Sequence, residues 1–329
     1  MKILIVKLSS LGDVVHAMPA VQDIRRALPD ARIDWVVERG FAPLVQRCAG
    51  VERVIPCEIR RWRKRPFARE TREAWRAFRA ELQAQAYDAV IDLQGLGKSA
   101  LVAWLARLAP GGQRHALGNR TEGSGYEAPT RWVAHHAVYI PPRIPAVARS
   151  RVLCAQSLGY VPDGPERFGL QAQAGMPVNE VALVHGTSRD DKLWPEAHWI
   201  ALARQLLAQG LRIGLPHGSD AEQQRASRLA DALGEGASVW PRLDLGRLTD
   251  RLATCAGVIG VDSGLSHIAT ALDLPHVQVY NFDTAWRTGP VDRLRQACVF
   301  ASPAPPVDAV WQAWLRVSHA PSGDVAAGA

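Results

Sequence analysis

The chain has few of the features that mark disulfide-rich, secreted or membrane proteins. Its five cysteines are scattered, odd in number and without C-x-x-C spacing. This argues against a disulfide framework and a cysteine zinc site, and it fits a reducing compartment. No apolar stretch reaches the length of a membrane span, and the run Ile3–Val6 is too short for a signal peptide. We therefore expect a cytosolic chain.

The common nucleotide and metal motifs are also missing. The loop Ser9-Ser10-Leu11-Gly12 has a single glycine, so no dinucleotide-binding G-x-G-x-x-G follows the first apolar run. Gly97-Lys98-Ser99 lacks the upstream glycine of a P-loop NTPase. No D-x-D pair stands in a loop, because Asp190 and Asp191 are adjacent. We expect no metal site and no cofactor.

What the chain does have is a globular composition with an excess of positive charge. Hydrophobic residues make up 47% and charged residues 22% of its 329 residues. This composition is typical of a folded protein, and the length suffices for two domains. The net charge of +7 favours anionic partners, such as nucleic acid, anionic lipid or a phosphorylated substrate.

Short apolar runs, each followed by a polar loop and a helical pattern, recur along the chain. Continuous apolar runs alternating with helices predict an α/β fold with buried parallel strands. We predict two Rossmann-like β/α/β domains that face a central cleft. The predicted strands are 3–6, 32–37, 51–56, 89–93, 181–186, 211–215, 258–261 and 276–280.

The same patterns predict the domain boundaries. We expect an N-terminal domain at 1–160, a Gly- and Pro-containing linker at 161–177 and a second domain at 178–303. A C-terminal helix follows within 304–318, and packing back on the N-terminal domain is one option for it. Small polar residues at 319–329 predict a disordered tail.

Two local expectations concern the first domain. Pro19 interrupts the apolar pattern after the first strand, so that helix either begins late or is kinked. The polar, Gly-rich stretch 111–129 predicts a loop.

The stretch Val258–Asp273 is a candidate anion site. It combines an apolar strand, the turn Asp262-Ser263-Gly264 and a helical pattern. A strand that turns tightly into a helix directs the free N–H groups of the helix at a ligand, usually phosphate. The alternative is an ordinary turn in which Asp262 caps the helix.

Asp13 is a candidate general base, because ligands of open α/β sheets bind beyond the carboxyl ends of the strands. The alternative is an N-cap with no chemistry. A helix start lowers the pKa of a carboxyl group, so Asp13 would be a weak base that needs desolvation. His16, His185 and His267 are rival bases, none with a carboxylate partner visible in the sequence.

A cationic cluster follows the third predicted strand, with Arg60, Arg61, Arg63, Lys64 and Arg65 close together. We expect it to bind anions, with a solvated basic surface as the alternative. Nucleic acid is disfavoured, because no known nucleic-acid module is recognisable.

Two longer motifs carry a family resemblance. The first, Lys7-Leu8-Ser9-Ser10-Leu11-Gly12-Asp13-Val14-Val15-His16, resembles the opening motif of the bacterial lipopolysaccharide heptosyltransferases of glycosyltransferase family 9, in particular the heptosyltransferase I group. The stretches His185–Pro195 and Asp262–His267 resemble donor-site motifs of that family. Ser263 stands where threonine is common, which is a mild departure.

The resemblance implies an inverting, metal-independent GT-B glycosyltransferase. It would move L-glycero-D-manno-heptose from ADP-heptose to the first Kdo of Kdo2-lipid A, as a peripheral protein on the cytosolic face of the anionic inner membrane. It implies Asp13 and Lys192 as catalytic residues. The implied donor-binding residues are Thr187, Ser188, Lys192, Glu222, Asp262, Ser263, Gly264, Leu265 and His267. The implied acceptor-binding residues are Ser10, Gly12, Arg60, Arg61, Arg63, Lys64 and Arg120.

Several of these residues also have other interpretations. Glu222 completes a capping box with Ser219, which competes with the implied contact to the donor ribose. We expect Asp262 to hold its turn without touching the diphosphate, because a carboxylate competes with phosphate for the same donors. Lys192 and backbone amides are then expected to stabilise the charge on the leaving diphosphate.

Two other functions remain alternatives to this prediction. A nicotinamide-dependent oxidoreductase would also use two Rossmann-like domains, but the G-x-G-x-x-G motif expected after its first strand is missing. A non-catalytic binder of anionic lipid or nucleic acid would use the cationic cluster alone.

Overall fold

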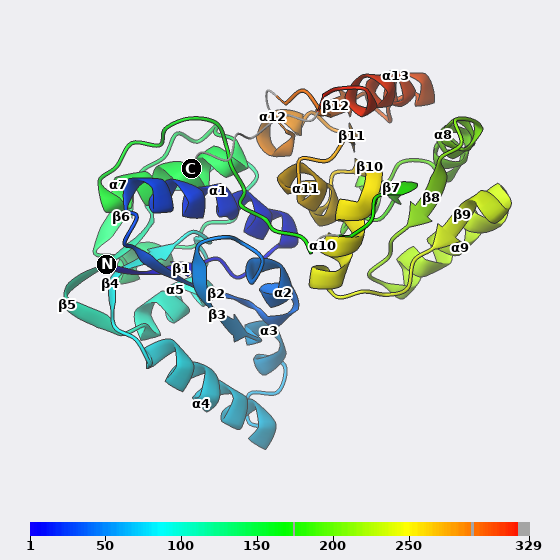
Figure 1. The fold of residues 1–329 in the computed structure, drawn as a ribbon. Coiled ribbons are helices and arrows are strands. Elements are labelled where there is room, and N and C mark those ends of the chain that lie inside the picture. The colour runs from blue at the N-terminus through cyan, green and yellow to red at the C-terminus, as the bar shows by residue number, and fades with distance from the viewer. Residues whose placement is uncertain (174, 291–292, 322–329) are drawn as a thin grey trace. The chain divides into compact units, whose positions relative to one another are not determined.

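The computed structural model describes residues 1–173, 175–290 and 293–321 (Figure 1). Contacts between residues divide the chain into two compact units, with the boundary between Gln171 and Ala172. This boundary lies inside the stretch 161–177, where we expected the linker.

The first unit is built on one parallel sheet of six strands in the order β3-β2-β1-β4-β5-β6. β1 occupies the centre, pairing with β2 and β4, and its residues Ile3 to Val6 are fully buried. Side chains on both faces of such a strand meet covering helices, which explains the unbroken apolar run. The strands are β1 (Lys2–Val6), β2 (Arg32–Glu38), β3 (Val51–Cys57), β4 (Tyr87–Asp92), β5 (Leu108–Leu117) and β6 (His136–Val138).

Helices cover both faces of this sheet. Phe78 and Leu82 of one helix and Val102 of the next share a core with Leu4 and Val90 of the strands. Figure 1 shows α4 and α5 on that side of the sheet and α1 with α7 on the other. The helices are α1 (Leu11–Ala27), η1 (Arg39–Phe41), α2 (Ala42–Val45), α3 (Ile59–Trp62), α4 (Arg69–Gln83), α5 (Gly97–Leu105), α6 (Pro129–Val133) and α7 (Ala146–Leu158).

The second unit repeats this plan with a parallel sheet in the order β12-β11-β10-β7-β8-β9. Its strands are β7 (Val178–Val184), β8 (Arg212–Leu215), β9 (Ala237–Val239), β10 (Cys255–Val261), β11 (His276–Tyr280) and β12 (Gln296–Phe300). Its helices are η2 (Asp190–Lys192), α8 (Glu196–Ala208), α9 (Asp220–Leu233), η3 (Gly234–Gly236), α10 (Leu245–Thr254), α11 (Gly264–Ala271), α12 (Ala285–Thr288) and α13 (Val307–Ser318). Each unit is thus an α/β unit built on a parallel sheet, which agrees with the predicted fold class.

The final helix α13 belongs to the second unit. Its apolar residues Val310, Ala313, Trp314 and Val317 share a core with Trp199 and with residues of β10 and β11. These residues place the apolar face of the helix within the second unit, and a contact of α13 with the N-terminal domain stays a prediction. Of the predicted tail, residues 322–329 lie outside the described ranges.

Several local predictions were wrong. α1 begins at Leu11 and continues through Pro19, so the late start did not occur. The expected loop at 111–129 begins with strand β5, which pairs with β4 and β6. Pro110-Gly111-Gly112 obscured this strand, because the β4–β5 register shifts there and Gly111 has a positive φ. The strands β6, β9 and β12 were not predicted either.

All five cysteines are free thiols. Among the described helices, none is both long enough and apolar enough to cross a bilayer.

Trp314→Ala should destabilise the second unit. The indole is 3% exposed, and its removal leaves a cavity beside Gly257 and the α8 residues. We expect a loss of about 3–5 kcal/mol in the free energy of unfolding, measured by urea denaturation. Gln312→Ala, on the exposed side of the same helix, is the control and should change it by less than about 0.5 kcal/mol. Equal losses in both variants would contradict this account of α13.

Candidate functional site

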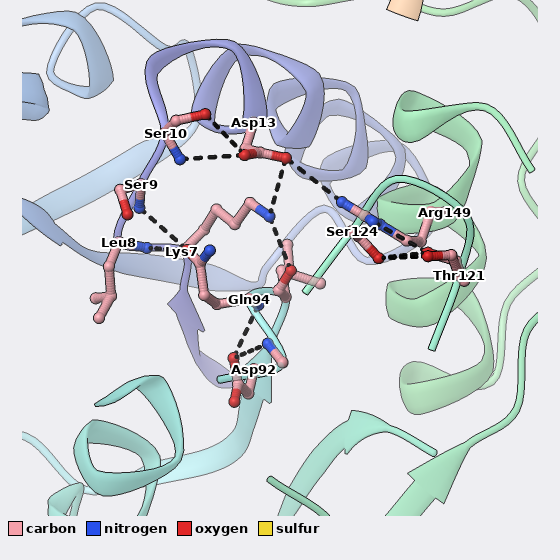
Figure 2. Close-up of polar contacts among 12 residues, drawn as sticks. Lys7, Leu8, Ser9, Ser10, Asp13, Asp92, Gln94, Thr121, Ser124 and Arg149 are labelled. Atoms are coloured by element: carbon pink, nitrogen blue, oxygen red, sulfur yellow. Dashed lines mark hydrogen bonds and ion pairs between the residues drawn. The ribbon is translucent and has the colours of Figure 1, made fainter. Parts of the chain in front are cut away.

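The loop after β1 is held in place by the loop after β4. The Gln94 side-chain oxygen accepts hydrogen bonds from the backbone N–H groups of Leu8 and Ser9, each at 3.1 Å. Asp92 accepts from the N–H of Gln94 at 2.8 Å and from that of Gly95 at 3.2 Å. Figure 2 shows these contacts leading from β4 to the start of α1. The carboxyl ends of two neighbouring central strands therefore fix the position of Asp13.

Asp13 lies in the first turn of α1, and the N-cap of this helix is Ser10. Asp13 Oδ2 accepts from Ser10 N at 3.1 Å and from Ser10 Oγ at 2.8 Å. Ser10 and Asp13 form a capping box at the start of α1. Asp13 therefore helps to cap the helix, as the sequence alternative had it, but it does so from the third helical position and is not itself the N-cap. The capping role occupies one carboxylate oxygen and leaves the other for different partners.

That other oxygen contacts two cations. Asp13 Oδ1 lies 3.6 Å from Lys7 Nζ and 3.5 Å from Arg149 Nη2 (Figure 2). Burial acts to raise the pKa of Asp13, but the charges of Lys7 and Arg149 outweigh it, and the pKa lies well below its usual range. The expected direction was right, although its main cause is these cations. The Asp13 side chain is 35% exposed, so an ionised carboxylate remains accessible.

The predicted acceptor residues of the first unit do not all lie together. Arg60 Nη2 donates to Ser9 Oγ at 3.1 Å, next to Ser10 and Gly12. Arg61 is exposed and pairs with Glu58 at 3.2 Å. The structure places Arg63, Lys64 and Arg120 at exposed positions, with no contact of theirs to Asp13 among those described. The cluster also begins inside α3 and is not wholly a loop.

Sequence reasoning missed three cations near Asp13. Lys7 is buried in spite of its charge, and Arg149 comes from α7. Lys98 Nζ donates to Ser9 Oγ at 3.0 Å, and burial together with Arg60 lowers the pKa of Lys98. A lysine just after an apolar strand was a usable signal for Lys7, but no sequence feature indicated Arg149.

In the second unit, the loop after β7 is attached to the ends of β10 and β11. Thr187 Oγ1 donates to the backbone oxygen of Asp262 at 3.1 Å. Asn281 Nδ2 donates to the backbone oxygens of Asp191 and Leu193 at 3.3 and 2.8 Å. These bonds bring two of the predicted donor motifs together. Ser188 lies exposed on the same loop.

Asp262 is the centre of this second cluster. Its Oδ2 lies 2.6 Å from Lys192 Nζ, and its Oδ1 lies 3.4 Å from His267 Nε2. Burial acts to raise the pKa of Asp262, but the contacts with His267 and Lys192 lower it well below its usual range. His267 therefore has the carboxylate partner that the sequence did not reveal.

The alternative that Asp262 caps the helix is wrong. The N-cap of α11 is Ser263, and the Asp262 side chain turns to its ionic partners. Gly264 and Leu265 form the first turn of α11, as predicted. Ser266 is fully buried, and its hydroxyl donates to the Val261 backbone oxygen at 2.6 Å.

Glu222 has the capping role offered for it, and its contact with the donor ribose stays a prediction. It forms the predicted capping box with Ser219 and also accepts from Gly218 N at 2.6 Å. Its side chain lies against Gly186 in the loop after β7, where a Cβ would come within 2.5 Å of Glu222 Oε1. The capping role thus places the carboxylate beside the donor motif.

Lys192→Met should destabilise the second unit by about 1–3 kcal/mol at pH 7, because the buried Asp262 carboxylate loses a partner and keeps only His267. The folded pKa of Asp262 is depressed, so its contribution is present above about pH 4 and is lost as the pH falls through the folded pKa. The difference from wild type should therefore shrink in acid, which unfolding at a series of pH values measures. Arg189→Met breaks the exposed pair with Asp191 in the same loop and is the control, and it should leave the free energy of unfolding nearly unchanged. A pH-independent difference would contradict the ionic account.

Comparison with known proteins identifies the family. Residues 75–308 match the sequence model of glycosyltransferase family 9 (heptosyltransferase). The chain is 43% identical over 288 residues to lipopolysaccharide heptosyltransferase 1 of Escherichia coli (strain K12), covering 85% of this chain and 88% of that protein. It is 40% identical over 309 residues to lipopolysaccharide heptosyltransferase 1 of Pseudomonas aeruginosa, covering 89% and 82%.

Solved structures agree with this assignment. Escherichia coli heptosyltransferase WaaC with ADP matches with a TM-score of 0.84 and 37% identity, covering 95% of this chain and 98% of that one. WaaC with ADP-2-deoxy-2-fluoro heptose matches with a TM-score of 0.81. The predicted GT-B fold and the family resemblance are confirmed. The chain belongs to glycosyltransferase family 9, the heptosyltransferase family, and is a glycosyltransferase.

Proposed function

We propose that this glycosyltransferase moves L-glycero-D-manno-heptose from ADP-heptose to the first Kdo sugar of Kdo2-lipid A, with inversion, in lipopolysaccharide inner-core biosynthesis. The observation that carries the acceptor chemistry is the ionised, partly exposed Asp13 carboxylate at the end of the central strand β1. The donor is supported by the relatives solved with ADP and with a fluorinated ADP-heptose.

In this reaction Asp13 is the general base. It takes the proton of the Kdo hydroxyl as that oxygen attacks the anomeric carbon of the heptose and the bond from this carbon to the phosphate oxygen breaks. Attack opposite the leaving ADP inverts the anomeric centre. The depressed pKa keeps Asp13 ionised and ready to accept a proton, but it also makes Asp13 a weak base.

On the donor side, Lys192 stabilises the negative charge that develops on ADP. Lys192 is paired with Asp262, so diphosphate binding requires the ammonium group to be shared or exchanged. Thr187, Ser188, Ser263, Gly264, Leu265 and His267 line the diphosphate side of the donor site. Glu222, beside Gly186, contacts the ribose.

On the acceptor side, Arg60 and Lys98 meet at Ser9 Oγ and provide positive charge close to the base. Arg61, Arg63, Lys64 and Arg120 supply further cations for the phosphates and carboxylates of the acceptor.

The lipid acceptor places the enzyme at the cytosolic face of the inner membrane as a peripheral protein. Two tryptophans of the first unit support this, since Trp104 is 60% and Trp132 78% exposed. Indoles favour the membrane interface, and the net charge of +7 favours anionic headgroups.

The proposed reaction can be tested with ADP-heptose and Kdo2-lipid A in the absence of divalent metal, with ADP release as the readout. Wild type should produce ADP only when both substrates are present. Asp13→Asn should lower kcat by at least about 100-fold, because it removes the base, while ADP binding measured by calorimetry stays unchanged. Full turnover by Asp13→Asn would refute the base assignment, and no turnover by wild type would refute the proposed substrates.

Neutralising three residues of the cationic cluster should weaken the binding of the acceptor. In the variant Arg61→Gln, Arg63→Gln, Lys64→Gln, we expect the acceptor KM to rise about tenfold or more, with the donor KM within twofold of wild type. Arg72→Gln, Arg76→Gln, Arg79→Gln removes the same charge from exposed positions of α4 and is the matched control. An equal rise in the control would indicate a diffuse field, and no rise in either would restore the solvated-surface alternative.

A further inference from the structure

Arg149, in the first turn of α7, contacts two segments of the first unit that are far apart in sequence. Its Nη2 lies 3.5 Å from Asp13 Oδ1, and its Nη1 donates to Thr121 Oγ1 at 3.1 Å. Arg149 is 7% and Thr121 2% exposed, so bulk water screens these contacts little. Figure 2 shows the guanidinium between the carboxylate and the threonine hydroxyl.

Thr121 is itself fixed within a tight turn. Its Oγ1 lies 2.7 Å from Ser124 Oγ, and its backbone oxygen accepts from Ser124 Oγ at 3.0 Å and from Ser124 N at 3.2 Å. Thr121 lines an open surface pocket together with Arg120, Glu122, Gly123 and Pro142. The arginine therefore connects the edge of a pocket to the carboxylate at the end of the central strand.

We propose that Arg149 is a positioning residue for Asp13: the turn Thr121–Ser124 holds the guanidinium, and the guanidinium fixes the orientation and the proton affinity of the Asp13 carboxylate. The inference rests on the proposed role of Asp13 as the base. Neither oxygen of Asp13 is then free to rotate, because Ser10 holds Oδ2 while Arg149 and Lys7 hold Oδ1. Such pre-organisation is what a base needs to meet an incoming hydroxyl.

The other groups around Asp13 determine what a change at Arg149 should do. Lys7 faces it from the end of β1, Ser10 and His16 from α1, and Asp92 of β4 acts on Lys7. Lys7 remains when Arg149 is replaced, so the proton affinity of Asp13 should rise without reaching that of an unpaired buried carboxyl group.

The direct test is an NMR titration of Asp13 in protein labelled at the aspartate carboxyl carbons. The signal is identified by its absence in Asp13→Asn. In Arg149→Gln the titration midpoint should rise by about one to three pH units, whereas Arg149→Lys keeps the charge and should keep the midpoint low. An unchanged midpoint in Arg149→Gln would overturn the proposal. If Arg149→Gln does not fold, Arg149→Lys is measured in its place. A midpoint in Arg149→Lys as high as that of an unpaired carboxyl group would also overturn the proposal.

A matched control exists on the same two helices. Arg151, also on α7, holds Asp23 of α1 with Nε–Oδ2 at 2.6 Å and Nη2–Oδ1 at 3.1 Å. Arg151→Gln should lower the Tm, because it breaks a buried ion pair between α1 and α7, and it should leave the Asp13 midpoint unchanged. If Arg151→Gln shifts that midpoint as far as Arg149→Gln does, the effect comes from helix packing and the proposal fails.

The role of Thr121 is tested by a double-mutant cycle in the transfer assay. Thr121→Val removes the hydroxyl and keeps the volume, so it should lower kcat several-fold with both KM values unchanged. In the Arg149→Gln background the same change should have no further effect, and an equal loss in both backgrounds would break the link between Thr121 and Arg149. The NMR titration needs no substrate. If Asp13→Asn retains transfer while Arg149→Gln still shifts the midpoint, only the base assignment fails.

Discussion

A carboxylate at the end of a buried parallel strand needs positive charge beside it to remain ionised. Each unit of this protein meets that requirement once. Asp13 follows β1 and contacts Lys7 and Arg149, and Asp262 follows β10 and contacts Lys192 and His267. In each case burial opposes the charge and the basic partners outweigh it. The positions of the proposed catalytic groups depend on these ionic contacts.

The two clusters use this constraint for different chemistry. In the first unit the proposed base is an ionised carboxylate, and its basic partners restrain it until the acceptor hydroxyl arrives. In the second unit the proposed ligand of the diphosphate is the lysine, and the carboxylate holds it in place before the donor binds. The same kind of ion pair therefore lowers the pKa of the proposed base at one sheet and holds the proposed diphosphate ligand in position at the other.

Neighbouring strands hold the loops that carry these groups. Gln94 after β4 binds the backbone of the loop after β1, and Asn281 after β11 binds the loop after β7. Because parallel strands end at the same edge of a sheet, a side chain from one strand can position the loop of the next. Both loops thereby gain a fixed geometry, although the only regular structure in the loop after β7 is the short 3₁₀ helix η2.

The sequence by itself determined the α/β class, the central strands and the motifs of the family, because apolar runs and turn residues act over short distances along the chain. The Ser219–Glu222 capping box was predictable for the same reason. Only the tertiary structure decided that Arg149 reaches Asp13, that Asp262 binds Lys192 instead of capping its helix, and that 108–117 pairs as a strand. These contacts join residues separated by 136, 70 and about 20 positions. Their formation depends on where the sheet brings distant segments together, which local residue patterns do not encode.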